Sequence, residues 1–162
     1  MNSRKIKAKV GIIMGSKSDY KIMSDSEKIL KKINILFETI IVSAHRTPDR
    51  LYNFARTAKN KYQVIIAGAG GAAHLPGMVA SLTHLPVIGV PIETKSLKGL
   101  DSLLSIIQMP KGIVTATVAI NNSTNAGLLA AEILAISDKK IEKNLLKFRK
   151  KLTNSIKKNP KK

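Results

Sequence analysis

Five short apolar runs, separated by segments with a helical period, constrain the fold of this chain most strongly. The runs cover residues 9–14, 37–42, 64–67, 87–90 and 114–120. Because most of them contain apolar residues at successive positions rather than only at every second one, they indicate strands buried on both faces of a parallel sheet. Parallel strands need crossover connections, and these are right-handed in nearly all folds.

The segments between the runs carry apolar residues three or four positions apart, which is the period of a helix with one buried face. Asp19 suits the N-cap of the first helix, and Pro48 suits the first turn of the second. Helices are therefore expected over residues 19–32, 47–58, 76–82, 100–108, 124–136 and 139–157. The predicted fold is a single-domain, three-layer α/β/α architecture with a five-stranded parallel, flavodoxin-like sheet and a C-terminal helix.

The expected helix over residues 124–136 is rich in Gly and Ala. Small side chains let a helix backbone approach its neighbour closely. That neighbour is either the sheet of the same chain or another subunit, and the sequence leaves both open.

The composition is that of one globular domain. The chain has 162 residues, of which 44% are hydrophobic and 23% charged, as is ordinary for such a domain. We expect one domain over residues 1–162, with flexible tails at 1–8 and 158–162. No apolar run is long enough to span a bilayer and the start lacks the apolar core of a signal peptide, so we expect a cytoplasmic protein without membrane contact. Without cysteine, and with three histidines that lack paired acids, no metal site is expected.

The net charge of +18 suggests nucleic acid as a partner, but its distribution argues against one. Residues 1–9 and 139–162 hold 15 of the 28 Lys and Arg residues and one of the ten acidic residues. Nearly all the basic residues are lysine, and aromatic residues make up only 4% of the chain. Nucleic-acid grooves usually offer arginine and stacking aromatic rings. We therefore interpret the excess as a solvated lysine-rich surface and expect no nucleic-acid partner.

The segment Ser43–Pro48 places His45 and Arg46 at the exit of a strand that we expect to be buried. In open α/β sheets this edge is where ligands bind. The pair combines a proton carrier that works near neutral pH with a fixed cationic fork for an anion. The alternative is a structural histidine that caps the next helix, and the residues alone do not decide between the two.

The loop Gly15–Asp19 follows the first expected strand and precedes a helix. Its N–H groups, with the hydroxyls of Ser16 and Ser18, could hold an oxyanion at the helix N-terminus. Asp19 could instead accept hydrogen bonds from sugar hydroxyls. A simple turn with a capping Asp is the structural alternative. The spacing of a Walker loop is absent.

A glycine-rich loop, Gly68–Ala73, follows the third expected strand. Its side chains are absent or single methyl groups, so a flat ligand could lie against the backbone. A tight turn that needs positive φ is the structural alternative. We favour a ligand wall, because one turn would not need so many small residues. His74 is a weaker functional candidate than His45, and His84 is interpreted as a surface residue.

Together with the segment Asp101–Pro110, these three loops resemble the N5-carboxyaminoimidazole ribonucleotide mutase family. This family is the catalytic-subunit type of phosphoribosylaminoimidazole carboxylase in purine biosynthesis. The resemblance covers roughly residues 9–150, and Arg46-Thr47-Pro48 resembles the bacterial mutase class rather than the CO2-using class. It implies a cofactor-free migration of a carboxylate from the exocyclic nitrogen to the ring carbon of an imidazole ribonucleotide, through CO2 that is released and recaptured.

The resemblance also implies roles for individual residues. His45 would carry the proton, Arg46 and the first loop would hold the phosphate, and Asp19 would bind ribose. Gly70, Gly71 and Ala72 would form the wall around the base and CO2, and His74 and Leu75 would close the site, from this chain or a neighbouring subunit. The remaining substrate-binding residues implied by the resemblance are Gly15, Ser16, Ser18 and Ser43.

The family resemblance implies a homo-octamer, and a functional hand-off of substrate from the ATP-dependent carboxyaminoimidazole ribonucleotide synthase. The segment 112–117 and the short loop 121–125 depart from the family pattern, away from the three ligand loops. Two other functions stay open: a CO2-using aminoimidazole ribonucleotide carboxylase on the same fold, and a non-catalytic nucleotide-binding module.

Overall fold

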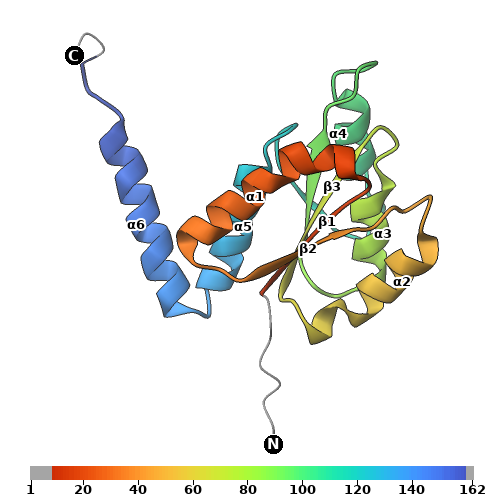
Figure 1. Ribbon diagram of the computed structural model, residues 1–162, viewed down its shortest axis with the longest axis horizontal. Coiled ribbons are helices and arrows are strands. Elements are labelled where there is room, and N and C mark those ends of the chain that lie inside the picture. The colour runs from red at the N-terminus through yellow and green to blue at the C-terminus, as the bar shows by residue number, and fades with distance from the viewer. Residues whose placement is uncertain (1–8, 160–162) are drawn as a thin grey trace, which may run out of the picture.

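The computed structural model describes residues 9–159, which form a five-stranded parallel sheet in the order β2-β1-β3-β4-β5 (Figure 1). This confirms the predicted flavodoxin-like sheet. Every neighbouring pair of strands is parallel. The strands are β1 (Val10–Met14), β2 (Phe37–Ile41), β3 (Val64–Gly70), β4 (Val87–Ile92) and β5 (Ala116–Thr117).

Helices cover both faces of the sheet, as the three-layer prediction requires (Figure 1). One face carries α1 (Tyr20–Ile33) and α5 (Ser123–Ala135), against which α6 (Lys139–Ser155) packs. The other face carries α2 (Pro48–Thr57), α3 (His74–Leu82) and α4 (Leu100–Ile107). Two short 3-10 helices, η1 (Lys17–Asp19) and η2 (Ala58–Asn60), complete the elements of the described residues.

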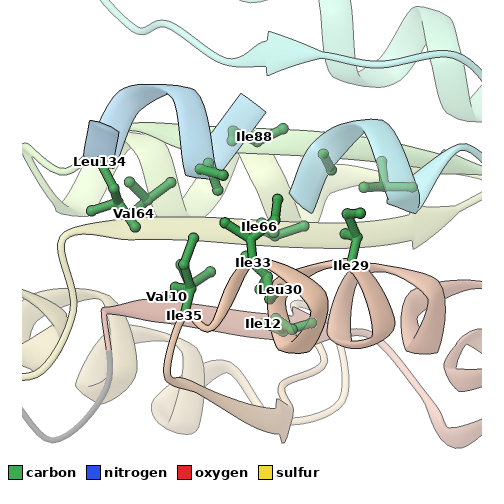
Figure 2. Close-up of a cluster of buried hydrophobic side chains, with 14 of the residues drawn as sticks. Val10, Ile12, Ile29, Leu30, Ile33, Ile35, Val64, Ile66, Ile88 and Leu134 are labelled. Carbon is green, nitrogen blue, oxygen red and sulfur yellow. The ribbon is translucent and has the colours of Figure 1, made fainter. Parts of the chain in front are cut away.

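Successive strand residues supply two separate hydrophobic cores. Val64 and Ile66 of β3 pack with α1 and α5, as Figure 2 shows, whereas Ile65 and Ala67 pack with α2 and α3. This alternation follows from the two-residue period of a strand. Both faces are apolar because both are covered by helices, which is why the strands read as continuous apolar runs.

The small residues of α5 pack inside this chain. A Cβ built on Gly127 would lie 2.3 Å from Ile29 Cγ2 and 3.2 Å from the carbonyl oxygen of Ser26, both in α1. Ala126, Ala130 and Ala131 are fully buried in the same core. The small residues of this helix thus allow close packing against α1 and the sheet of the same chain.

Strand β5 is much shorter than the predicted strand over residues 114–120. The structure pairs only Ala116 and Thr117 with Ile88 and Gly89 of β4. Pro91 lies inside β4, although the sequence predicted that the strand ends before it. Its carbonyl accepts from Asn121 N, so the N–H that proline lacks would face the β5 side. The ladder therefore lacks a donor at this position, which limits the C-terminal end of β5.

The burial of one strand and the boundaries of two other elements also differ from the prediction. Strand β2 is an edge strand with half-exposed and exposed residues, so it is not buried as expected. Strand β3 continues through Gly70, so the glycine loop begins only at Gly71. Helix α3 begins at His74 rather than at Pro76, because a proline is tolerated in the first helical turn, whose N–H groups have no partner within the helix.

Asp19 occupies the predicted N-cap position of α1 but does not cap that helix with its side chain. It instead accepts from the backbone N–H of Ser16, while Ser16 caps η1. The inserted 3-10 turn is the reason, since it moves the first capping position three residues upstream.

Most of the predicted flexible tails, residues 1–8 and 160–162, lie outside the described residues. Within residues 9–159, no helix is long and apolar enough to cross a membrane. The predicted surface position of His84 is confirmed.

Candidate active site

A cavity of about 400 Å³ lies at the carboxyl ends of β1, β2, β3 and β4. This is the edge where ligands bind in open parallel sheets. The structure brings together eleven of the twelve predicted site residues there: Gly15, Ser16, Asp19, Ser43, His45, Arg46, Gly70, Gly71, Ala72, His74 and Leu75. Ser18 is the exception, because its exposed hydroxyl is bonded to Ser16 and Asp19 outside the lining.

Five further residues line the cavity and were not predicted: Ala44, Ala69, Ile92, Glu93 and Thr94. Three of them form the exit of β4. The signal was present, because Glu93 and Thr94 are the first polar residues after an apolar run. It was missed because Pro91 was taken as the end of the strand rather than as part of it.

The first loop is held by its own side chains. Ser16 caps η1 by accepting from the Ser18 N–H, and Asp19 accepts from the Ser16 N–H at 3.0 Å. This capping box fixes two backbone donors and leaves the loop with one defined shape. This short loop thus carries one carboxylate and two hydroxyl groups.

Arg46 is positioned by bonds to two loops. Its Nε donates to Ser43 Oγ at 3.2 Å, and its Nη2 donates to the carbonyl oxygen of Gly15 at 3.0 Å. These bonds leave other guanidinium N–H groups for a ligand, since arginine carries five. The residue is exposed, so an anion entering the cavity meets an oriented cation.

The pKa of Asp19 is raised above its ordinary value of 3.8, mainly because burial disfavours the charged carboxylate. Hydrogen bonds from Ser16 and Ser18 and the charge of Arg46 oppose this shift. A half-buried carboxylate with a raised pKa in a cleft is a mark of a functional site. It suits an acceptor for ligand hydroxyls.

His45 and His74 form a hydrogen-bonded pair. The Nε2 atom of His45 lies 2.7 Å from the Nδ1 atom of His74, with the rings edge to face. One nitrogen of the two must carry the proton between them. The other ring nitrogens, His45 Nδ1 and His74 Nε2, take no part in this hydrogen bond. The pair can therefore keep one proton between the rings and exchange a second proton with a ligand. His74 thus contacts His45 within a single chain.

The glycine wall, Gly70, Gly71 and Ala72, is built from backbone. A Cβ on Gly70 would lie 3.4 Å from the carbonyl oxygen of Ile92, an ordinary van der Waals contact, so β4 borders this position. Gly71 has a φ of +66°, which L side chains rarely adopt. The two alternatives for this loop therefore coexist: one residue makes the positive-φ turn, and its neighbours keep the cavity free of side chains.

In the described part of the chain, no three His, Asp or Glu side chains come together as metal ligands. The polar groups at the cavity are instead an oriented cation, the carboxylates of Asp19 and Glu93, hydroxyls and two imidazoles. This set suits an anionic, hydroxyl-bearing ligand and a proton transfer.

Comparisons with known proteins show the family of this chain. A family model described as AIR carboxylase matches residues 9–155. An N5-carboxyaminoimidazole ribonucleotide mutase of Thermotoga maritima is 56% identical, over 91% of this chain and 87% of that protein. The Escherichia coli K12 protein of the same name is 52% identical, over 99% of this chain and 96% of that protein.

A solved structure has the same fold. The crystal structure of Treponema denticola PurE matches with a TM-score of 0.82 and 28% sequence identity, over 90% of this chain and 91% of that one. The family model spans nearly all the described residues and every element that lines the cavity. The chain belongs to the AIR carboxylase family.

Proposed function

We propose that this protein is an N5-carboxyaminoimidazole ribonucleotide mutase, an isomerase of purine biosynthesis. Relatives that carry this name are 52% to 58% identical to it over most of its length. The observation that carries the mechanism is the placement of His45 beside Arg46 at the cavity, with His74 bonded to His45. A proton carrier and an anion clamp are what this isomerisation needs.

The proposed reaction balances without a cofactor. His45 gives a proton to the exocyclic nitrogen as the N–CO2 bond breaks, which yields the free amine and CO2. The ring carbon then attacks CO2, a C–C bond forms, and His45 takes the proton that the ring carbon loses. One proton is given and one is recovered, so the enzyme returns to its starting state.

The remaining residues bind and enclose the substrate. Arg46, with the backbone and hydroxyls of the loop Gly15–Ser18, holds the phosphate, and Asp19 accepts from the ribose hydroxyls. Ser43 orients Arg46 through the bond to Nε. The glycine wall with His74 and Leu75 encloses the imidazole and CO2, which must not escape before the second bond forms.

The main alternative is a carboxylase that takes CO2 from solution and aminoimidazole ribonucleotide as its substrate. The triplet Arg46-Thr47-Pro48 favours the mutase, because it resembles that class. A second alternative is a module that binds the nucleotide without turnover; the oriented His45–His74 pair disfavours it.

An ultraviolet assay of carboxyl transfer tests the proposal. Purified protein receives either N5-carboxyaminoimidazole ribonucleotide or aminoimidazole ribonucleotide, each with and without added bicarbonate. We expect turnover of the first substrate at a rate that bicarbonate does not change. Turnover of only the second, dependent on bicarbonate, would establish the carboxylase. Binding of the nucleotide with no turnover of either substrate would establish the binding module.

We also propose a cytoplasmic homo-octamer that takes its substrate from an ATP-dependent carboxyaminoimidazole ribonucleotide synthase. Exposed apolar side chains on α6, including Leu146 and Leu152, support a contact between subunits. Sedimentation of the purified protein tests the assembly. A monomer at working concentration would contradict it.

A further inference from the structure

We propose that Ser102 of α4 is a positioning residue that fixes the glycine wall for carboxyl transfer, although it does not line the cavity. This rests on the proposed mutase function. Ser102 is fully buried, and its single hydroxyl joins two segments that do line the cavity. Any effect of Ser102 on the substrate is therefore indirect and passes through those two segments.

The hydroxyl of Ser102 both accepts and donates a hydrogen bond. Its Oγ accepts from the N–H of Gly71 at 2.9 Å and donates to the carbonyl oxygen of Ile92 at 2.7 Å. Gly71 follows β3 and Ile92 ends β4, so one side chain ties the ends of two strands together at the ligand edge. Buried polar groups without partners are costly, so this geometry is strongly preferred.

Among residues 9–159, no heavy atom lies within 4 Å of a Cβ built on Gly71, so side-chain packing does not hold this residue. Its φ of +66° is one that glycine adopts readily, so its own backbone preference does not fix it either. Ser105 adds a weaker contact, with Oγ at 3.3 Å from the Gly71 carbonyl oxygen and at 2.7 Å from that of Asp101. The conformation of Gly71 is therefore held from α4.

The direction of the Gly71 N–H has a chemical consequence. Because this N–H is bonded to Ser102, it is not available to bind a carboxylate in the cavity. The role of Gly71 is thus to close the wall, and the role of Ser102 is to keep it closed. A wall that relaxes should let CO2 leave between the breaking of the N–C bond and the forming of the C–C bond.

Ser123 provides a matched control elsewhere in the fold. It is also fully buried, and its hydroxyl also accepts from a backbone N–H, that of Ser26, and donates to a backbone carbonyl, that of Ile22. It joins α5 to α1, away from the cavity. Ser102→Ala and Ser123→Ala therefore remove equivalent hydrogen bonds, and each should lower Tm by about 4–8 °C.

The experiment measures kcat, KM and the fraction of turnovers that end as aminoimidazole ribonucleotide and free CO2, corrected for loss of CO2 without enzyme. For Ser102→Ala we expect kcat to fall by about tenfold or more, with KM within about threefold, because the wall is displaced while the phosphate clamp is kept. The escaping fraction should rise several-fold over that of the wild type. For Ser123→Ala we expect kcat and the escaping fraction to stay at the wild-type values.

Ser102→Thr distinguishes the positioning of the glycine wall from the stability of the whole protein. It keeps the hydroxyl but adds a methyl group to a fully buried site, so it should lose stability and still retain CO2. Ser102→Ala with the same kcat and escaping fraction as Ser123→Ala would overturn the inference and leave the proposed function intact. Wild-type protein that does not convert N5-carboxyaminoimidazole ribonucleotide would overturn both.

Discussion

Two regions of the same cavity are built in opposite ways. The polar region, Ser16, Asp19 and Arg46, is held by side-chain hydrogen bonds that lie in the cavity itself. The glycine wall has almost no side chains and is held from outside, by serines of α4. The first design suits recognition of a charged ligand, and the second suits a close fit that excludes water. The comparison predicts that binding and chemistry can be damaged separately.

The largest expected effect is on the chemical step. His45→Asn should fold normally, bind the substrate within tenfold of the wild type, and lose turnover by about 10²–10⁴-fold, because asparagine carries no proton. Steady-state rates and ligand titration measure the two quantities. His84→Asn, an exposed change outside the cavity, is the control. Turnover like that of the wild type in His45→Asn would remove His45 from the mechanism.

Arg46→Ala should damage binding instead. Loss of a charge-assisted hydrogen bond to the phosphate should raise the Kd of the substrate by about 10–100-fold. Arg50→Ala is a matched control, because Arg50 donates to the carbonyl oxygen of Ile41 and does not line the cavity. Equal affinities in the two variants would show that Arg46 does not hold the phosphate.

Gly71→Ala should damage the wall without adding a clash. An L residue at its positive φ costs about 1–2 kcal/mol of stability, and turnover should fall several-fold. Gly112 also has a positive φ with no heavy atom near its Cβ position, and it lies outside the cavity. Gly112→Ala should therefore lose similar stability, measured by urea unfolding, and keep full turnover. A similar loss of turnover in both variants would mean that strain alone, rather than the wall, limits the rate.

Asp19→Asn should change both the pH dependence of the free energy of unfolding and the affinity for the substrate. Because burial raises the pKa of Asp19, its contribution to the free energy of unfolding is greatest below pH 3.8 and decreases as the pH rises through the raised pKa. The variant should thus gain stability relative to the wild type as the pH rises through this window. Its substrate affinity should fall by about three- to tenfold through loss of a charged acceptor. A stability difference that does not change with pH would contradict this role of burial.

The smallest effect is expected far from both regions. Deletion of residues 158–162 removes three of the lysines at the chain end and no cavity residue. Turnover and affinity should remain unchanged, as measured beside the full chain. A large loss of activity would show that the basic end of the chain is functional.

The sequence was sufficient to predict the sheet and three of the four loops at its edge. The apolar runs that end at Met14 and Val42 are each followed directly by a polar loop, and this sharp change in composition marks the exit of a strand. The fourth loop was missed because Pro91 breaks the usual pattern of a strand while belonging to one. The same proline limits the C-terminal end of β5. This effect depends on which strand pairs with β4, and that pairing is set by the tertiary structure.

The contacts within the site were less predictable than its residues. The His45–His74 bond depends on α3 starting at His74, two residues before the boundary that Pro76 suggested. The hold of Ser102 on Gly71 joins residues 31 positions apart. Such contacts follow from how the helices pack on the sheet, α3 for His74 and α4 for Ser102, and the periodicity of a single segment does not specify that packing.

The origin of the product carboxylate tests the central claim most directly. Substrate labelled with carbon-13 in its N-carboxylate is converted in the presence of unlabelled bicarbonate, and the product is analysed by mass spectrometry after a single turnover. The account predicts that nearly all product carries the label on the ring carbon. Product that carries the carbon of bicarbonate instead would contradict an internal carboxyl migration in a closed cavity.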